Sequence, residues 1–458
     1  MRKESFAGRK VLIMGLGRFG GGVDVAKFAH SADAKVTITD LASGEQLSES
    51  LKQLKEFADI EYHLGSHNAA DFEQTDIVVV NPAVPPDNEF LKVAREHNKF
   101  ITSQINIFFE LCPATIIGIT GANGKSTTAA LTAHLLKNAR YEIQDTRYEK
   151  VWLSGNIGNE PLLTVIDQIG PDDLVVLELS SFQIEQLAEI EKAPHAALLT
   201  NLTPNHLDRY GTFTNYCAAK ESIFRFQKKD EDRPAVSIFN AEDKIGVEWF
   251  EKYKTEAGRI CIKFSVDDVS EEIRDKFSLP GRANLSNLAA AVAIARYFGI
   301  KDGWIKKCLP DFKGLPHRLE LAAEINGVWW YNDSKATTPE GAIAALEAFE
   351  QPKIIIAGGY DKNIAFDELG KKIAQEAKAA ILIGQTAEKI ADAIAACPKN
   401  QTRIEIVNSL AEAVARARHL VVGGDVVLLS PACASYDMFD NFEQRGQEFV
   451  RLVCQIAG

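Results

Sequence analysis

Short apolar segments alternate with amphipathic segments along most of this chain, and this alternation limits the possible folds more than any other feature. In the first hundred residues, VLIMG, KVTITD and DIVVVNPAV are typical of strands, whereas GGGVDVAKFAHSA and NEFLKVAREHN are typical of helices. Strands that are separated by helix-length segments pair in parallel, because each connection must cross back over the sheet. The pattern therefore predicts an α/β fold.

The same alternation recurs twice more along the chain. IGITG at 117–121 begins a second set, which continues with DLVVLELSS, HAALLTNLT and an Ala-rich helix at 284–298. The breaker GLPHRLE, Gly314 to Glu320, precedes a third set that contains VWWYNDS, KIIIAGG, AAILIG, RIEIV and VVLLSPA. At roughly 150 residues per domain, we expect three consecutive α/β domains over 1–103, 104–313 and 314–458.

Charge and composition exclude several classes of function. The 458 residues carry 51 basic and 63 acidic side chains, a net charge of −12, so the chain is a poor nonspecific binder of nucleic acid or anionic membranes. The N-terminal apolar run VLIMGLG is too short for a signal peptide, and no apolar stretch is long enough to span a bilayer. Seven scattered cysteines without a CxxC pair indicate reduced thiols. We expect a cytoplasmic protein with no nucleic-acid or membrane partner.

The segment GITGANGKST, residues 118–127, has the composition of a phosphate-binding loop between a strand and a helix. Its spacing differs from the common pattern G-x-x-x-x-G-K-[ST], because Ile119 stands where the first glycine belongs. In such a turn, backbone N–H groups face the β- and γ-phosphates, Lys125 adds positive charge and Ser126 can bind Mg²⁺. An ordinary Gly-rich turn is the alternative, but it would not need a lysine followed by hydroxyl groups.

A second glycine motif, GLGRFG at Gly15 to Gly20, also lies between a strand and a helix, and Asp40 ends the next strand. The motif predicts a diphosphate at the N-terminus of the helix. It leaves two alternatives open: an NAD-dependent oxidoreductase, or glycines that only permit close packing of strand and helix. Any nucleotide diphosphate satisfies the same physical requirements.

Further candidate residues follow the ends of predicted strands. Glu178 is placed where nucleotide-hydrolysing folds hold Mg²⁺, although a helix-capping acid is equally compatible. His206 lies in the polar loop NLTPNHLDRYG, and Lys220, on a helix, would by default be a solvated surface lysine. In the third region, polar residues follow three strands at the edge where α/β domains bind ligands, namely Asp333, Lys335, Asp361, Lys362 and Ser435. Cys433 is interpreted as a packing residue, since no histidine is near it in sequence.

Taken together, these stretches resemble the Mur ligases. The resemblance is carried, in the order of the family and over almost the whole chain, by TGANGKST, SGNIG, LELSSFQ, NLTPNHLDRYG, AAKESIF, GLPHRLE, NDSKATT, GGYDK and SPACASYDMFDNFEQRG. TGxNGK[ST] is the phosphate loop of that family, so the unusual spacing is a family variant. The segment 140–156 departs from the family pattern, because it is longer and more charged.

The resemblance implies a three-domain ligase that uses ATP and two Mg²⁺ ions. In such a ligase, a Rossmann-like N-terminal domain binds the UDP-sugar, the central domain is a P-loop-type ATPase, and a Rossmann-like C-terminal domain binds the amino acid. The resemblance is nearest to members that add D-glutamate to UDP-N-acetylmuramoyl-L-alanine through an acyl phosphate, during peptidoglycan precursor synthesis, and it implies a monomer. The resemblance implies that GLGRFG binds the UDP group of the substrate, so NAD is not needed to explain this motif. An oxidoreductase would leave GITGANGKST unexplained, and a noncatalytic regulator would bind ATP without amino-acid-triggered phosphate release.

The resemblance also implies roles for individual residues. Those expected to contact ATP are Gly121, Ala122, Asn123, Gly124, Lys125, Ser126, Thr127, Asn284, Arg318 and Asp333. Those expected to hold metal are Ser126, Glu178, His206 and Lys220, the last being the lysine that is carbamylated in relatives; Lys125, His206 and Lys220 are the expected catalytic residues. Those expected to bind the UDP-sugar substrate are Gly17, Arg18, Phe19, Asp40 and Asn156, and those expected around D-glutamate are Lys335, Thr337, Lys362, Ser435 and Phe442.

Overall fold

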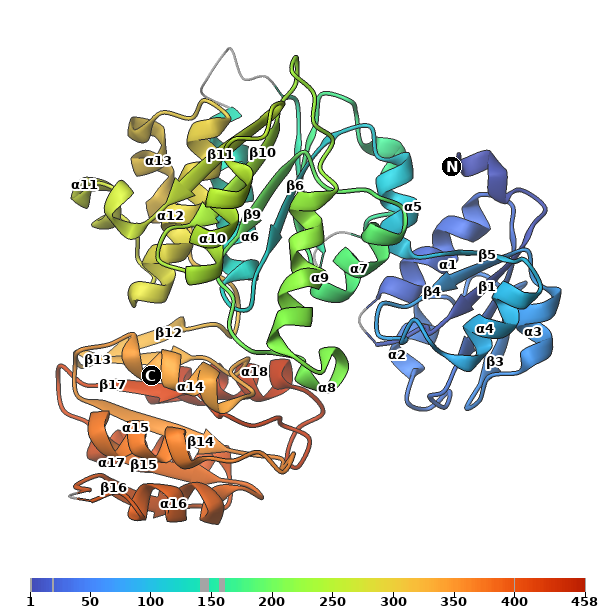
Figure 1. Cartoon of the computed structure of the whole chain (residues 1–458). Helices are drawn as coiled ribbons and strands as arrows, with labels where there is room; N and C mark the ends of the chain where they lie inside the picture. The colour runs from blue at the N-terminus through green and yellow to red at the C-terminus, as the bar shows by residue number, and fades with distance from the viewer. Residues whose placement is uncertain (1, 19, 141–147, 156–160, 399, 458) are drawn as a thin grey trace. The chain divides into compact units, whose positions relative to one another are not determined.

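The computed structural model describes residues 2–18, 20–140, 148–155, 161–398 and 400–457 (Figure 1). Phe19 and Asn156, two of the predicted substrate contacts, lie outside the described residues, as do residues 141–147 of the segment 140–156. Residues Met1–Ser270 with Asn287–Cys308 form one compact unit, and residues Glu271–Ser286 with Leu309–Gly458 form another. The first unit contains two α/β sheets and the second contains one. Three such sheets confirm the predicted fold class, whereas the predicted boundaries at 103 and 313 stay predictions.

The first sheet has five parallel strands in the order β3-β2-β1-β4-β5. Val11 and Ile13 of β1 enter one hydrophobic core, while Leu12 and Met14 enter the core on the other face, as expected for a strand with helices on both sides. The strand order reverses between β1 and β4, which is where doubly wound sheets bind ligands. The elements are β1 (Lys10–Met14), β2 (Lys35–Asp40), β3 (Glu61–Leu64), β4 (Ile77–Val80), β5 (Phe100–Thr102), η1 (Lys3–Phe6), α1 (Gly21–Ser31), α2 (Ser48–Lys52), α3 (Ala69–Gln74), α4 (Glu89–Glu96) and α5 (Gln104–Leu111).

The second sheet has six parallel strands in the order β11-β10-β9-β6-β8-β7. Because β6 lies between β8 and β9, the carboxyl ends of these three strands are neighbours at one edge. The strands are β6 (Thr115–Thr120), β7 (Val151–Gly155), β8 (Leu174–Glu178), β9 (Ala196–Leu199), β10 (Ala235–Asn240) and β11 (Arg259–Phe264). The helices of this part of the chain are α6 (Lys125–Arg140), η2 (Ile166–Gln168), α7 (Ser181–Glu189), α8 (Leu207–Tyr210), α9 (Phe213–Arg225), α10 (Lys244–Tyr253), η3 (Val266–Asp268), α11 (Glu271–Arg274), α12 (Arg282–Tyr297), α13 (Asp302–Cys308) and η4 (Leu309–Asp311).

The third sheet is mixed, with the order β12-β13-β17-β14-β15-β16. The edge strand β12 runs antiparallel to β13, whereas the other neighbours are parallel. The sequence patterns did not predict β12, because it starts inside the segment that we interpreted as a breaker. Its elements are β12 (Glu320–Ile325), β13 (Val328–Asn332), β14 (Lys353–Gly358), β15 (Ala377–Ile383), β16 (Arg403–Ile406), β17 (Val426–Leu429), α14 (Pro339–Glu347), α15 (Asp367–Glu376), α16 (Ala387–Ala395), α17 (Leu410–Leu420) and α18 (Phe442–Ala457).

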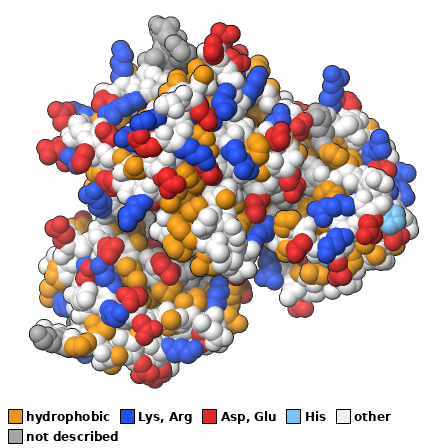
Figure 2. Space-filling model, in the orientation of Figure 1, with side chains coloured by type: hydrophobic (Ala, Val, Ile, Leu, Met, Phe, Trp, Pro, Cys, Tyr) orange, Lys and Arg blue, Asp and Glu red, His pale blue; other side chains and the backbone are white. Residues whose placement is uncertain are grey.

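The described residues show the mixed surface charge and the unpaired cysteines of an ordinary globular protein (Figure 2). Figure 2 shows Lys and Arg side chains interspersed with Asp and Glu on the visible face of the molecule. Among the described residues, no helix is both long enough and apolar enough to pass through a bilayer. All seven cysteines are free thiols.

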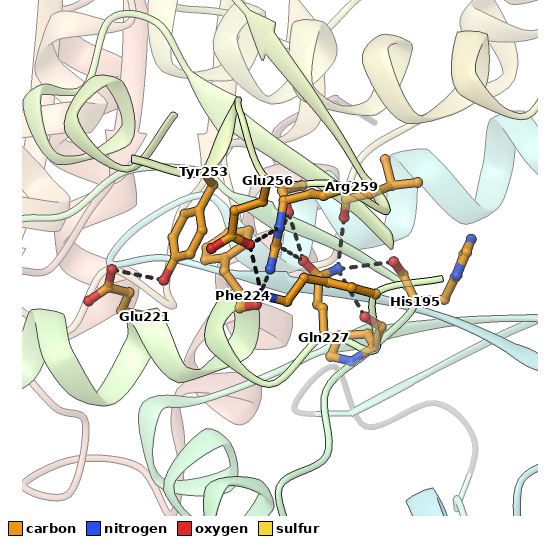
Figure 3. Close-up of polar contacts among 11 residues, drawn as sticks. His195, Glu221, Phe224, Gln227, Tyr253, Glu256 and Arg259 are labelled. Atoms are coloured by element: carbon orange, nitrogen blue, oxygen red, sulfur yellow. Dashed lines mark hydrogen bonds and ion pairs between the residues drawn. The ribbon is translucent and has the colours of Figure 1, made fainter. Parts of the chain in front are cut away.

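A buried arginine ties together the edge of the second sheet that lies opposite the carboxyl ends of its strands (Figure 3). Arg259 begins β11, and its side chain is fully buried. Its guanidinium donates hydrogen bonds to Gln227 Oε1 (2.6 Å), Ser237 Oγ (2.6 Å), the Phe224 carbonyl (2.9 Å) and Glu256 Oε2 (3.1 Å). Such a group stabilises the fold only while all of its donors are satisfied.

We expect Arg259→Met to destabilise the protein by about 3 kcal/mol, because several buried acceptors would lose their donor at once. The free energy of unfolding, measured by urea titration, checks this expectation. Arg403→Met is the matched control, since Arg403 begins β16 with a side chain that is 58% exposed; an exposed pair of this kind contributes less than about 1 kcal/mol. Equal losses of stability in the two variants would contradict the role of Arg259.

Candidate active site

The phosphate loop is a four-residue turn between Thr120, which ends β6, and Lys125, which begins α6. Gly121 and Gly124 have φ angles of 151° and 80°, a region that L-residues rarely adopt. A Cβ on Gly121 would lie 1.9 Å from Thr200 Oγ1, and one on Gly124 would lie 2.2 Å from Asn287 Oδ1. Both positions therefore require glycine, for conformation and for space.

The residues that follow β9 hold this loop from the side. The Ala122 N–H donates to the Asn201 carbonyl (2.8 Å), and the Asn123 N–H donates to Asn201 Oδ1 (3.0 Å). Thr200 Oγ1 donates to the Asn123 carbonyl (2.7 Å). The loop is thus fixed in shape before any ligand binds, which favours electrostatic stabilisation of phosphate.

Lys125 lies over its own loop, since its Nζ donates to the Ala122 carbonyl at 2.8 Å. Ser126 and Thr127 follow it in the first turn of α6, and both are buried. A lysine amino group and two hydroxyl groups are therefore gathered at the positive end of the α6 dipole, a position that favours bound anions.

Glu178 and Lys220 are two buried ionisable residues next to the phosphate loop. Glu178 is the last residue of β8 and only 5% exposed, and its Oε2 has no hydrogen-bond partner among the described residues. Lys220, on α9, is 1% exposed, and its Nζ donates to Thr120 Oγ1 at 3.1 Å. The default interpretation of Lys220 as a solvated surface lysine is therefore wrong, because α9 packs this face of the helix against the end of β6.

Burial and the charges of Lys125 and Glu178 all act on the pKa of Lys220. Burial lowers the pKa of the Lys220 amine well below its ordinary value; the positive charge of Lys125 lowers it further, and Glu178 opposes the shift. The uncharged amine is the form that can react as a nucleophile.

His206 lies at the start of α8 with a left-handed backbone (φ 52°). Its ring packs against Phe182 and Tyr216, with centroid distances of 5.0 and 6.3 Å. Desolvation lowers the pKa of His206, and the positive charges of Lys220 and Lys125 add to this effect, while Asp208 opposes it. A neutral imidazole is the form that binds metal.

The polar residues around the phosphate loop fit Mg²⁺, which keeps water and phosphate ligands, better than a metal whose ligands all come from protein side chains. Within the part of the chain that the structure describes, no group of three or more His, Cys, Asp or Glu side chains could hold a metal ion. Mg²⁺ commonly binds to one or two carboxylates together with substrate phosphates and water. The unpartnered, buried Oε2 of Glu178 beside the phosphate loop is such a carboxylate oxygen.

The glycine turn of the first sheet is closed by Asp40. Gly15, Gly17 and Gly20 all have positive φ angles, and α1 begins directly after them. The Asp40 carboxylate accepts hydrogen bonds from the Gly17 N–H (3.0 Å) and the Ala42 N–H (2.8 Å). Asp40 therefore braces the turn in this structure, while Arg18 is exposed.

The third sheet brings four predicted substrate-binding segments together at the carboxyl ends of β13, β14 and β17. Lys335 Nζ lies 5.3 Å from the centre of the Phe442 ring, and Tyr360 forms a backbone bridge with Ala434. Ser435, directly after that bridge, is 3% exposed. Thr337 is half-buried just before α14, and Lys362 is exposed.

Asp333, a predicted ATP contact in the second unit, is buried directly after β13. Its carboxylate accepts hydrogen bonds from Ser430 Oγ (2.8 Å) and the Leu319 N–H (3.2 Å). Burial raises the pKa of Asp333 to about 7, although these hydrogen bonds and Arg318 oppose the shift. Asn284, the remaining predicted ATP contact of this unit, donates from Nδ2 to the Pro280 carbonyl (2.8 Å).

Asp333→Asn should change how stability depends on pH. Because the folded-state pKa lies above the ordinary value of 3.8, the native protein keeps a proton that the unfolded chain loses between about pH 4 and 7. Stability therefore falls across this window and is constant above it. The amide cannot ionise and can still bond Leu319 and Ser430, so we expect the variant to be more stable at pH 8 by about 1–4 kcal/mol, at about 1.4 kcal/mol per pKa unit. Urea titration at pH 5 and pH 8 measures the free energy of unfolding of both proteins. If the advantage of the variant over the wild type is no larger at pH 8 than at pH 5, the expectation is wrong.

Comparison with known proteins gives a consistent answer over the whole chain. Residues 9–103 match the Mur ligase MurD-like N-terminal domain, residues 119–295 the Mur ligase middle domain, and residues 317–433 the Mur ligase glutamate ligase domain. A UDP-N-acetylmuramoylalanine--D-glutamate ligase from Roseiflexus sp. (strain RS-1) is 39% identical over 480 residues, covering 98% of both chains. The chain belongs to the Mur ligase family.

Other Mur ligases agree with this result. The ligase of the same name from Thermoanaerobacter sp. (strain X514) is 38% identical, covering 98% of this chain and 99% of its own. The crystal structure of a UDP-N-acetylmuramate-alanine ligase from Thermotoga maritima shares the fold, with a TM-score of 0.59 at 19% identity, covering 98% of this chain and 100% of that one. The resemblance inferred from the sequence motifs is confirmed, and the Mur ligase middle domain implies that the chain binds ATP.

Sequence reasoning missed several residues that shape the site of this Mur ligase. Thr200 and Asn201 brace the phosphate loop, and their position at the end of a strand next to β6 could have indicated them. Asn287, which fills the space opposite Gly124, lies on a helix without any such signal. Arg445, described below, was also missed.

Proposed function

We propose that this Mur ligase adds D-glutamate to UDP-N-acetylmuramoyl-L-alanine at the expense of ATP, as an EC 6.3.2.9 enzyme of peptidoglycan precursor synthesis. The observation that carries the proposal is the end-to-end similarity, at 35–39% identity, to relatives named as D-glutamate ligases. The MurD-like N-terminal domain supports the same substrate pair. We further propose that the enzyme is a cytoplasmic monomer.

The chemistry is two successive displacements. The L-alanine carboxylate of the UDP substrate attacks the γ-phosphorus of ATP, ADP leaves, and an acyl phosphate forms. The amine of D-glutamate then attacks the acyl carbon, a tetrahedral intermediate loses inorganic phosphate, and an amide bond remains, with one proton released from the amine. The acyl phosphate is needed because a free carboxylate is a poor electrophile. The protein's contribution is to position the reactants and to stabilise negative charge.

The phosphate loop residues supply that stabilisation in our proposal. The loop from Gly121 to Thr127 binds the ATP phosphates through backbone N–H groups other than those of Ala122 and Asn123, which bond Asn201. Lys125 neutralises the charge that builds up on the transferred group. The left-handed glycines and the bonds from Asn201 support this, because they aim the loop before ATP arrives. In the other unit, Asn284, Arg318 and Asp333 are proposed to contact ATP.

Two Mg²⁺ ions are part of the proposal, and the residues fit them. Ser126 and Glu178 would hold one ion, and His206 with a carbamylated Lys220 the other. When bound, the ions neutralise phosphate charge. The lowered pKa of Lys220 supports carbamylation, because the uncharged amine is the nucleophile that adds to CO₂, giving a carbamate and one released proton.

The substrates occupy the two Rossmann-like sheets in this proposal. Gly17, Arg18 and Asp40 are proposed to bind the UDP group. Lys335, Thr337, Lys362, Ser435 and Phe442 are proposed to bind D-glutamate, and their gathering at one edge of the third sheet supports this.

Phosphate release from ATP tests the proposal. The assay contains the enzyme, Mg²⁺ and UDP-N-acetylmuramoyl-L-alanine, with D-glutamate, L-glutamate, L-lysine or meso-diaminopimelate as the added amino acid. We expect rapid release with D-glutamate and at least about a hundred-fold less with the others, because the site must pair two carboxylates of one configuration. Equal rates with all four amino acids, or release only with another of them, would contradict the proposed substrate.

A further inference from the structure

The C-terminal α/β region contains a buried arginine that lies in the motif SPACASYDMFDNFEQRG but has been given no role so far. Arg445 lies on α18, three residues after Phe442, and is 1% exposed. Its guanidinium donates from Nε to Ser334 Oγ (2.9 Å), from one terminal nitrogen to the Ser334 carbonyl (2.8 Å) and from the other to the Cys433 carbonyl (3.1 Å). All of these acceptors are uncharged.

A buried cation without an anionic partner is uncommon, because removing a charge from water is costly unless an opposite charge compensates it. Arg445 forms no ion pair with any carboxylate of the described residues. Burial lowers the pKa of Arg445 to about 10, with Cys433 and Asp437 opposing the shift. Asp437 Oδ2 accepts the Gln385 N–H at 3.1 Å, and its Oδ1 has no hydrogen-bond partner among the described residues, so this carboxylate acts on Arg445 through its charge and not through a hydrogen bond. At neutral pH Arg445 is therefore charged, and no described carboxylate forms an ion pair with it.

Arg445 also contacts, or lies close to, every segment that we assign to D-glutamate. Ser334 directly precedes Lys335, and Cys433 lies two residues before Ser435. A Cβ on Gly359, in the segment that leads to Lys362, would lie 3.3 Å from an Arg445 terminal nitrogen. Ser334 Oγ, which accepts from Arg445, donates to the Phe442 carbonyl at 2.8 Å. One side chain thus joins the ends of β13, β14 and β17 to the start of α18.

We propose that Arg445 is a positioning residue that selects an amino acid with a second carboxylate. Through its bonds to Ser334 and Cys433 it holds the segments of Lys335, Ser435 and Phe442 in place. Its positive charge, which forms no ion pair with a described carboxylate, favours a dianionic ligand at this edge of the sheet. The inference rests on the proposed function, since it deepens the role of the D-glutamate site. It assigns Arg445 no contact with the reacting atoms.

The test separates capture of the amino acid from formation of the acyl phosphate. Arg445→Met removes the charge at similar size, and Arg445→Lys keeps the charge but cannot make all three hydrogen bonds. We expect Arg445→Met to raise the KM for D-glutamate by about 30-fold or more and Arg445→Lys by about 3- to 10-fold. The KM values for ATP and UDP-N-acetylmuramoyl-L-alanine should change less than about two-fold, because those substrates do not depend on this charge.

Hydroxylamine provides a second readout, because it traps an acyl phosphate as a hydroxamate without needing the amino-acid site. We expect both Arg445 variants to form hydroxamate at about the wild-type rate. Arg259→Lys is the matched control, a buried arginine in the other unit, and should leave the KM for D-glutamate unchanged. Thermal unfolding of each variant establishes that it is folded.

Each outcome decides one of the two claims. A wild-type KM for D-glutamate in folded Arg445→Met overturns the inference, and so does a wild-type KM in Arg445→Lys if the Met variant does not fold. Equal losses of hydroxamate formation and of D-glutamate capture also overturn it, because they indicate general damage. Wild-type enzyme that forms neither hydroxamate nor the D-glutamate product overturns the proposed function itself.

Discussion

Replacing Lys125 by alanine should lower the rate of ATP-dependent ligation by about a thousand-fold or more, with little effect on folding. Loss of a single well-placed electrostatic donor costs about 10²- to 10³-fold in other enzymes, and here the missing group would also leave the transferred phosphate without its only loop cation. The rate falls because Lys125 stabilises charge that develops as the γ-phosphate moves to the carboxylate.

The fold should tolerate this change, because the loop is held by contacts that do not involve the lysine side chain. Asn201 and Thr200 bond the backbone of Ala122 and Asn123, whereas the half-buried Lys125 amine donates to the Ala122 carbonyl of its own loop. Removing it should cost about 1 kcal/mol or less.

Steady-state phosphate release and thermal unfolding, measured on the same preparations, check both parts of this expectation. Lys137→Ala is the control, since Lys137 is an exposed lysine on the same helix and should leave both measurements at the wild-type value. A Lys125→Ala enzyme that releases phosphate at the wild-type rate would show that this loop does not bind the ATP phosphates.

Glu178→Gln should lower kcat by about a hundred- to a thousand-fold while leaving stability unchanged or slightly higher. The amide keeps the size of the side chain but is a much weaker ligand for Mg²⁺, which prefers charged oxygen ligands. In the folded protein, Glu178 is a buried carboxylate with one unpartnered oxygen. Removing its charge therefore removes a desolvation cost, which offsets the lost attraction to the neighbouring lysines.

Two measurements distinguish a metal ligand from a structural acid at this position. The concentration of Mg²⁺ that gives half-maximal rate should rise at least about ten-fold in Glu178→Gln, and the midpoint of urea unfolding should not fall. Glu191→Gln, an exposed carboxylate just beyond α7, should change neither. If Glu178→Gln unfolds at lower urea and keeps the wild-type Mg²⁺ dependence, Glu178 is structural.

Much of this site followed from local sequence. The glycine turn before Lys125 needs a strand before it and a helix after it, and both are visible as short-range patterns. The sequence puts Glu178 at the end of an apolar strand, where nucleotide-hydrolysing folds hold Mg²⁺ and where a helix-capping acid is an equal alternative. The structure agrees, since β8 pairs with β6 and Glu178 pairs with Ile119 in the register.

Local sequence patterns could not reveal other features of the site, because these depend on which side chains the fold buries. Lys220 is an ordinary lysine on an amphipathic helix by sequence, and only the packing of α9 against β6, with Thr120 and Lys220 100 residues apart, removes it from water. Asn287 meets Thr128 over 159 residues, and Arg445 meets Ser334 over 111. The antiparallel edge strand β12 was hidden for a related reason, since an edge strand with one solvated side lacks the apolar run of its neighbours.

The sequence by itself therefore determined the α/β class, the glycine turns and the strand ends that carry the polar residues, since backbone conformation and hydrophobic periodicity act within a few residues. Only the tertiary structure decided which charged side chains lose their water and which distant segments meet, as with Lys220 beside Glu178 and Arg445 among the strand ends of the third sheet. The physical reason is that desolvation and packing depend on neighbours supplied by the whole fold, and these neighbours set the charge and position of each group.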